Sequence, residues 1–112
     1  MILDVETIEH LTVVTPHGDL DTAAADRFKR VLDDLLAQQR LRILLDLGAV
    51  PYLDSTGLGA LVSAMRRVRA VGGDIRVCAL QPDVRSVLEI TRLTKIITVH
   101  GSRADAIDAW RE

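Results

Sequence analysis

The residues best suited to chemistry in this sequence lie between Tyr52 and Gly59, where Asp54, Ser55 and Thr56 are consecutive. The stretch falls where a strand and loop lead into a helix, which puts Ser55 at the helix N-terminus. Backbone N–H groups lack intrahelical partners there, and the helix dipole is positive at that end. Phosphate oxygens on Ser55 could therefore accept hydrogen bonds from those groups.

Two interpretations of this stretch are open on local chemistry alone. In the functional one, Gly57 and Gly59 remove side-chain bulk just behind the serine, so a partner's backbone or a kinase active site could approach closely. In the other, Ser55 only caps the helix and the two glycines only serve packing.

Catalysis has little support in the sequence. A serine hydrolase needs a base beside its nucleophile, but His10, His17 and His100 lie in or beside predicted strands with no obvious route to Ser55. The residues that flank the serine do not form the Gly-x-Ser-x-Gly turn of such enzymes either. We therefore expect no enzyme and no catalytic residue.

Asp19 and Asp21 form a second acidic group, in Gly18-Asp19-Leu20-Asp21. They could belong to a metal site, but acidic residues beside a helix cap are the commoner arrangement, and Asp21 or Thr22 is a plausible N-cap. The single cysteine, Cys78, excludes a cysteine cluster and an internal disulfide. No Gly-x-x-x-x-Gly-Lys loop is present to cradle a nucleotide, so we expect no metal and no cofactor.

A phosphoacceptor receiver domain is the nearest rival among signalling folds. The apolar run Arg42–Leu47 resembles its central strand, with Asp46 as the acceptor, and Asp19 and Asp21 could pass for its acidic pair. The remaining receiver residues are missing, since no Ser or Thr closes the strand Ile75–Leu80 and no Lys follows Ile96–His100.

Short apolar runs alternate with longer amphipathic segments along the chain, a pattern typical of an α/β domain. Glu9-His10 joins the first two runs as a tight connection, which predicts an antiparallel hairpin. The order strand, helix, strand, helix, strand from Arg42 onward predicts a largely parallel sheet. The expected strands are Ile2–Ile8, Leu11–Thr15, Arg42–Leu47, Asp74–Leu80 and Lys95–His100.

Helices are expected between these strands because apolar residues recur at helical spacing. The first begins near Asp21, the second runs from Ser55 to Gly72-Gly73, and two more cover about Pro82–Thr91 and Arg103–Trp110. The apolar stripes are Phe28, Val31, Leu32, Leu35 and Leu36 in the first helix, Leu58, Leu61, Val62, Met65 and Val68 in the second, and Val84, Val87, Leu88 and Ile90 in the third.

Composition limits the class of protein further. The 112 residues suit one domain, and 48% hydrophobic with 27% charged residues is ordinary for a globular protein. A net charge of −2 and only three aromatic residues give no case for nucleic-acid binding. No signal peptide or membrane-length apolar run is evident, so we expect a cytoplasmic protein with no membrane contact.

Four parts of the sequence together resemble the STAS domain of bacterial anti-sigma factor antagonists. Asp54–Gly59 is similar to the family signature, and Gly18–Asp21 to its Gly-acidic-Leu-Asp segment. Gly72-Gly73 and the stretch Ile90–Ile97 resemble later landmarks, and the order is kept over essentially all 112 residues. The resemblance implies one STAS domain over residues 1–112. Its expected fold is a mixed, mostly parallel sheet with an N-terminal antiparallel hairpin and flanking helices.

The resemblance also implies a function and its residues. Ser55 is the expected phosphoacceptor of a kinase that is itself the anti-sigma factor, and a metal-dependent serine phosphatase resets the switch. The unphosphorylated antagonist binds the kinase and frees the sigma factor. The implied partner-binding residues are Asp21, Thr22, Asp54, Ser55, Thr56, Gly57 and Leu58.

Four points stay open at this stage. Thr56 is a neighbouring hydroxyl that could compete as acceptor, and Arg92 stands where many family members have Gly. The alternative function is an accessory or scaffold subunit of a transporter or stress-signalling complex without a serine switch. A monomer or weak dimer is the expected oligomeric state.

Overall fold

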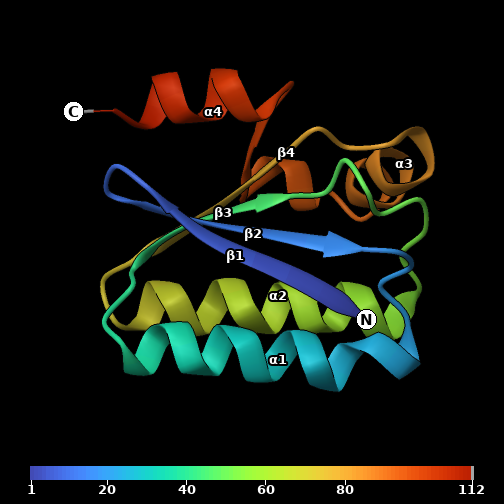
Figure 1. Cartoon of the computed structure of the whole chain (residues 1–112). Helices are drawn as coiled ribbons and strands as arrows, with labels where there is room; N and C mark the ends of the chain where they lie inside the picture. The colour runs from blue at the N-terminus through green and yellow to red at the C-terminus, as the bar shows by residue number, and fades with distance from the viewer. Residues whose placement is uncertain (112) are drawn as a thin grey trace.

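A five-stranded sheet with strands in the order β1-β2-β3-β4-β5 organises the molecule. The computed structural model describes residues 1–111 (Figure 1). Neighbouring strands in the sheet are thus consecutive in the chain. The strands are β1 (Ile2–Ile8), β2 (Leu11–His17), β3 (Arg42–Asp46), β4 (Asp74–Cys78) and β5 (Thr98–His100).

The β1–β2 pair is an antiparallel hairpin, and all later pairs are parallel. Glu9 and His10 form its two-residue turn. Glu9 has a φ of 55°, and a positive φ at the first turn residue is typical of such hairpins. The predicted mixed sheet is confirmed. The second strand extends two residues beyond the predicted end, because Pro16 and His17 pair with Leu3 and Ile2.

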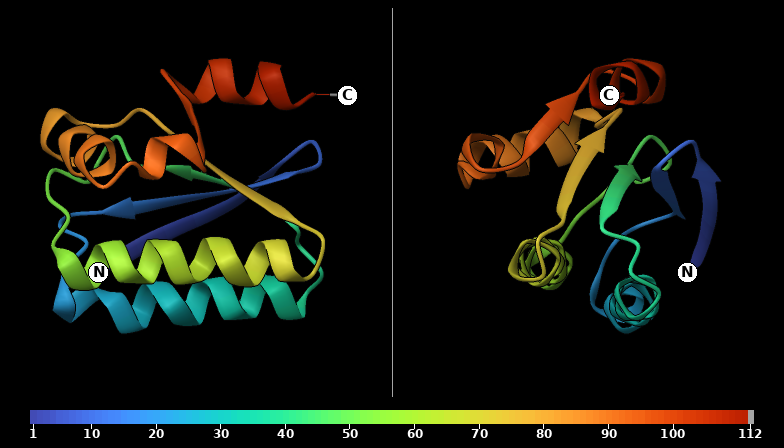
Figure 2. Two further views of the ribbon diagram at one scale, coloured as in Figure 1. Left: turned by 180° about the vertical axis from the view of Figure 1, so that it is seen from behind. Right: turned by 90° about the vertical axis from the view of Figure 1, so that its left-hand side faces the viewer.

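Four α-helices and a short 3₁₀ helix cover the sheet. They are α1 (Thr22–Ala37), α2 (Ser55–Ala70), α3 (Pro82–Ile90), η1 (Leu93–Lys95) and α4 (Arg103–Trp110). Helices α1 and α2 lie side by side on one face, whereas α4 crosses the other face (Figures 1 and 2). Within residues 1–111 no helix has the length and apolar character needed to cross a membrane.

Alternation along the strands divides the core between these two faces. The inward residues toward α1 and α2 include Val14, Ile43, Leu45, Ile75 and Val77, and they belong to a large cluster around Phe28 and Leu61. The residues toward α4 are Leu11, Val13, Leu44 and Cys78, which pack with Ala106 and Trp110.

The predicted helical stripes are confirmed in outline. Phe28, Leu32 and Leu35 are buried in α1, and Leu61, Met65 and Val68 are buried in α2. Val31, Leu36, Leu58 and Val62 are only partly buried at the edges of the same core. Ile90 is the exception, because it ends α3 on the solvent side and is 81% exposed.

The predicted last strand, Lys95–His100, is wrong over its first three residues. Leu93–Lys95 forms η1 instead, and β5 begins only at Thr98. Leu93 and Ile97 are buried in the core, and the turn between them exposes Ile96. The burial of Leu93 and Ile97 on either side of this turn prevents the strand from starting at Lys95.

Arg92 explains why this late turn suits glycine. Its φ of 60° lies in the left-handed region, which glycine adopts without the steric cost that a side chain adds. The departure from the family pattern therefore keeps the backbone shape of the turn and adds an exposed cation to it.

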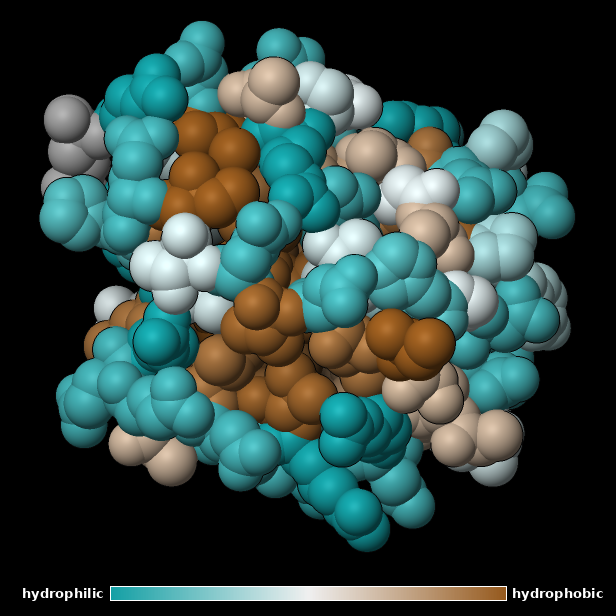
Figure 3. All heavy atoms as spheres, viewed as in Figure 1, coloured by the Kyte–Doolittle hydropathy of each residue, from teal (hydrophilic) through white to brown (hydrophobic). Residues whose placement is uncertain are grey.

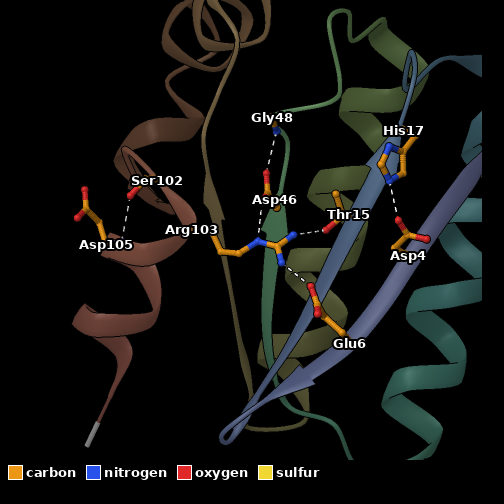
Figure 4. Close-up of polar contacts among 9 residues, drawn as sticks. All are labelled: Asp4, Glu6, Thr15, His17, Asp46, Gly48, Ser102, Arg103 and Asp105. Carbon is orange, nitrogen blue, oxygen red and sulfur yellow. Dashed lines mark hydrogen bonds and ion pairs between the residues drawn. The ribbon is translucent and has the colours of Figure 1, made fainter.

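Arg103, the first residue of α4, fastens that helix to the sheet. Its Nε donates to Asp46 Oδ2 at 2.8 Å and one terminal nitrogen donates to Thr15 Oγ1 at 2.7 Å. A second terminal nitrogen donates to Glu6 (Figure 4). Burial lowers the pKa of the Arg103 guanidinium, but its bonds to Asp46 and Glu6 outweigh burial and raise it overall. We call these four residues the Arg103 junction.

Candidate functional site

The N-termini of α1 and α2 meet beside one another because the segments that precede them pair. Leu20 and Leu53 form a parallel bridge, with Leu20 N–H donating to the Tyr52 carbonyl at 3.0 Å and Asp54 N–H to the Leu20 carbonyl at 3.3 Å. This short pairing brings the predicted partner-binding residues of both helices to one end of the molecule.

Gly57 permits this close approach. A Cβ at that position would lie 1.9 Å from the Leu20 carbonyl oxygen, inside any allowed contact. Gly57 is also buried, so it serves the packing of the chain itself. Gly59 has open space where a Cβ would be. The two glycines of the motif thus do different things, which the sequence alone left undecided.

Asp54 is the N-cap of α2 and the centre of the polar contacts. Its Oδ1 accepts from Gly57 N–H at 2.8 Å, and its Oδ2 accepts from the backbone N–H and the hydroxyl of Thr22 at 3.2 and 3.4 Å. The Gly57 bond holds the pKa of the Asp54 carboxyl below its ordinary value. Burial opposes this effect, and the Thr22 bonds add to it. Asp54 therefore carries a negative charge at neutral pH.

The two hydroxyls after Asp54 have different surroundings. Thr56 Oγ1 accepts a hydrogen bond from Thr22 Oγ1 at 3.2 Å. Ser55 is exposed at the first position of α2. Among the 111 described residues no side chain is bonded to its hydroxyl. Ser55 is thus the more accessible of the two predicted acceptors.

The remaining predicted site residues lie around this centre. Asp21 caps α1, and its Oδ1 accepts from Ala24 N–H at 3.1 Å. It stands one residue before Thr22, but its carboxylate is used by its own helix. Leu58 is partly buried and packs against the main core, so only part of its side chain faces solvent.

Residues suggested for other chemistries lie elsewhere and have other partners. His17 bonds Asp4 at 2.8 Å, and His100 lies beside Arg76 in β4. Burial, followed by the Arg76 charge, lowers the pKa of His100. Asp46, the receiver-like acceptor, is held by the Arg103 junction. Residues 1–111 contain no group of three or more His, Cys, Asp or Glu side chains placed to bind a metal.

A groove between α1 and α2 adjoins the site and was not predicted. Its volume is about 220 Å³, and its lining residues are Ala25, Asp26, Lys29, Thr56, Ala60, Ser63 and Arg67. Thr56 links it to the Asp54 centre. Only the spacing of small residues along α2 could have indicated it, and that spacing does not reveal which helix lies alongside.

Comparisons with known proteins find a family model and a relative that match most of the chain. The STAS domain family model matches residues 3–106. The anti-sigma-B factor antagonist of Bacillus subtilis is 31% identical over 97 residues, which cover 87% of this chain and 88% of that protein.

Solved structures give the same fold. A crystal structure of an anti-sigma factor antagonist from Mycobacterium paratuberculosis has a TM-score of 0.90 at 25% identity, covering 99% of this chain and 94% of that one. The Bacillus cell fate determinant SpoIIAA in its phosphorylated form has a TM-score of 0.78 at 22% identity, covering 98% of this chain and all of that one.

Proposed function

The chain belongs to the STAS domain family, and on that basis we propose that it is an anti-sigma factor antagonist controlled by phosphorylation of Ser55. The unphosphorylated protein binds an anti-sigma factor kinase, and a sigma factor is released. The kinase then modifies Ser55 and dissociates, and a metal-dependent serine phosphatase restores the binding form. Residues 1–112 act as one regulatory domain, a binding protein rather than an enzyme.

The observation that carries this proposal is the position of Ser55. It is an exposed hydroxyl at the N-terminus of a helix, directly after a carboxylate that stays ionised. A kinase can reach it, and the added phosphate must then lie beside the Asp54 charge. The Gly57 N–H that could have received a phosphate oxygen is already bonded to Asp54.

An electrostatic switch follows from that arrangement. Phosphorylation adds about −1.5 to −2 charges at neutral pH. A partner surface matched to a neutral serine beside Asp54 would then meet an excess of negative charge and a strongly hydrated group. About 1.4 kcal/mol of added repulsion and desolvation lowers affinity tenfold, so a few kcal/mol suffice without a change of fold.

The surface that a partner would cover includes the exposed Thr22, Ser55 and Thr56, with Asp21 and Leu58 at its border. This is the end of the molecule where α1 and α2 begin (Figure 1). We propose a cytoplasmic location, since the kinase draws on ATP. Binding of the kinase does not require a second copy of this chain.

The test compares wild type with Ser55→Ala, Ser55→Asp and Thr56→Val. Each tagged protein is incubated with native lysate and ADP, and the retained proteins are identified by mass spectrometry. A kinase-like anti-sigma factor should be retained by wild type and Ser55→Ala and lost with Ser55→Asp. Thr56→Val alters the same surface, so it serves to test which hydroxyl is modified. With ATP, the purified partner should phosphorylate wild type and Thr56→Val, but leave Ser55→Ala unmodified.

Two results would contradict the proposal. If all four proteins retain the same transporter or scaffold subunits, Ser55 is no switch, and the chain is an accessory or scaffold STAS protein. If Ser55→Ala is phosphorylated at Thr56 as fast as wild type is modified, the acceptor has been misassigned.

A further inference from the structure

The outer edge of β1 is an unpaired strand edge seven residues long. Within residues 1–111, β1 is the first strand in the sheet order and pairs only with β2. The end-on view shows it at the margin of the sheet (Figure 2). The two-residue turn makes Ile8 and Leu11 the closing pair, which is hydrogen-bonded in such hairpins. Every second pair of an antiparallel ladder is bonded in this way.

This alternation determines whether the backbone N–H and C=O groups of each β1 residue point toward β2 or away from it. Ile2, Asp4, Glu6 and Ile8 turn their N–H and C=O groups toward β2. Leu3, Val5 and Thr7 turn theirs outward, away from the sheet. Pro16 fits this assignment, because it stands opposite Leu3, at a pair that needs no N–H from β2 toward β1. Outward-facing groups of this kind can receive another strand.

The α1 side of this edge is apolar at Leu3 and Val5 and polar at Thr7, whose hydroxyl accepts a hydrogen bond from Arg40 at 2.6 Å. Val5 is 44% exposed on this side, and Leu3 is partly buried against the main core. Val5 lies at a groove of about 310 Å³ between β1 and α1. Its apolar lining comes from Val5, Val31 and Leu35, and its charged lining comes from Glu6, Asp34 and Arg40. The space-filling view shows apolar side chains gathered across the middle of the face that carries β1 and α1 (Figure 3).

The α4 side of the same edge is acidic. The side chains of Asp4 and Glu6 are 69% and 52% exposed. His17, the ion-pair partner of Asp4, neutralises it only when protonated. Glu6 shares the single guanidinium of Arg103 with Asp46, so that group of three keeps a net negative charge. The exposed carboxylates of Asp4 and Glu6 can therefore still attract cations.

From these features we propose that β1 is a docking edge for an extended segment of a partner protein in which apolar and basic side chains alternate. Paired to Leu3, Val5 and Thr7 through the main chain, such a segment would place its apolar residues over the β1–α1 groove. Its basic residues would then lie beside Asp4 and Glu6. The proposal does not depend on phosphorylation of Ser55.

A second copy of this chain fits the edge less well. An antiparallel pair centred on Val5 would satisfy the outward backbone groups, but it would set Asp4 directly opposite Glu6 of the other copy, twice. Like charges directly opposite one another destabilise a strand pair. Carboxylates in this position guard against self-association and favour a basic partner.

The probe is a capped seven-residue peptide in which four valines alternate with three lysines, titrated into the ¹⁵N-labelled full chain. Amide signals of Leu3, Val5 and Thr7 should shift, with a dissociation constant of about 1 mM or below. A matched peptide with glutamates in place of lysines should cause no shift. Analytical ultracentrifugation of the protein alone should show a monomer at the concentrations used.

Three variants locate the contact. Val5→Pro removes an outward N–H without touching the β1–β2 ladder, and Val5→Lys sets a like charge against the peptide. Each should weaken binding at least about tenfold. Asp4→Asn should weaken it about two- to fivefold. Dispersed amide spectra and an unchanged melting temperature would show that each variant is folded. If Val5→Pro unfolds, Val5→Lys and Asp4→Asn still test the contact.

The proposal fails if neither peptide shifts the β1 amides or if both do so equally. It also fails if the shifts survive Val5→Lys. Concentration-dependent dimerisation that Val5→Lys abolishes would show that a second copy occupies the edge instead.

Discussion

Two aspartates of the β3–α2 segment show how differently one side chain can be used. Asp54 is bonded to N–H groups and a hydroxyl at the start of two helices, and the serine next to it is open to solvent. Asp46 ends β3, is only 14% exposed, and is bonded to Arg103, which lies 57 residues further along the chain.

The difference lies in the donor that each carboxylate has. Backbone N–H groups hold Asp54 without neutralising it, so its charge is available to a partner or to a phosphate on Ser55. A guanidinium cancels the charge of Asp46 and connects α4 to three strands. The Ser55 end is therefore accessible to a partner, whereas the Arg103 junction holds α4 on the sheet.

The largest effect that tests this contrast is expected from Gly57→Ala. The new Cβ would overlap the Leu20 carbonyl oxygen at 1.9 Å, and neither the backbone of Leu20 nor that of α2 can move without breaking the Leu20–Leu53 pairing. The free energy of unfolding should fall by about 3 kcal/mol. Urea unfolding followed by circular dichroism measures this.

Gly59→Ala is the matched control in the same helix. Among residues 1–111, no atom outside the nearby part of its own helix lies within 4 Å of a Cβ there, so alanine should stabilise α2 by up to about 1 kcal/mol. Equal losses of stability in both variants would mean that the contact between position 57 and the Leu20 carbonyl is not tight. The segments at the Ser55 end would then be able to move apart.

Arg103→Met is expected to have the next largest effect. It keeps a long apolar stem but leaves Asp46 and Glu6 without their shared cation. The free energy of unfolding should fall by about 2 kcal/mol, measured by the same urea titration. Amide chemical shifts of Thr22, Ser55 and Thr56 should stay within the range of wild type. Large shifts there would show that the two regions are coupled.

The same contrast explains what could be predicted from the sequence. The Asp54–Gly59 motif is local, since cap, serine and glycines follow one another, and helix-start rules place them correctly. Strands of alternating or continuous apolar residues were also predictable, as β1 and β3 show, and so was the helix α4. Each depends on neighbours within a few residues.

Contacts between distant residues were not predictable in this way. Arg103 could pair with any of several carboxylates, and only the fold brings Glu6, Thr15 and Asp46 to it. Likewise, Thr22 lies within hydrogen-bond distance of Asp54 because Leu20 and Leu53 pair. Nothing in the sequence around these two leucines indicates that they pair. The turn at Leu93–Lys95 was missed because it is held by the burial of Leu93 and Ile97 in the core, which the local sequence does not reveal.

A pH titration tests whether the charge of the Asp54 carboxylate stabilises the native state. Its folded pKa is depressed, so its ionised form stabilises the native state at pH values above the unfolded pKa, and this contribution is lost as pH falls through the folded pKa. Asp54→Asn removes that contribution at every pH. The variant should unfold at lower urea concentration than wild type at neutral pH.

The difference in urea midpoint between the two proteins should then shrink as pH falls from about 5 to about 3. Contributions of other carboxylates affect both proteins alike and cancel in the difference. A difference that stays constant over this range would mean that the carboxylate charge plays no part in holding the helix start, and that Asp54 acts by shape alone.

The smallest effect concerns Cys78, a probe beside the Arg103 junction. Burial, followed by the Asp46 charge, raises the pKa of its thiol to about 12, although Arg103 opposes this. Iodoacetamide at pH 8 should therefore react only when α4 lifts from the sheet. Arg103→Met should accelerate labelling about fivefold by making that opening easier, whereas Gly57→Ala, although less stable overall, should leave the rate near that of wild type. If labelling instead follows global stability in both variants, α4 and the Ser55 end unfold as one unit, and their separation into two independent regions is wrong.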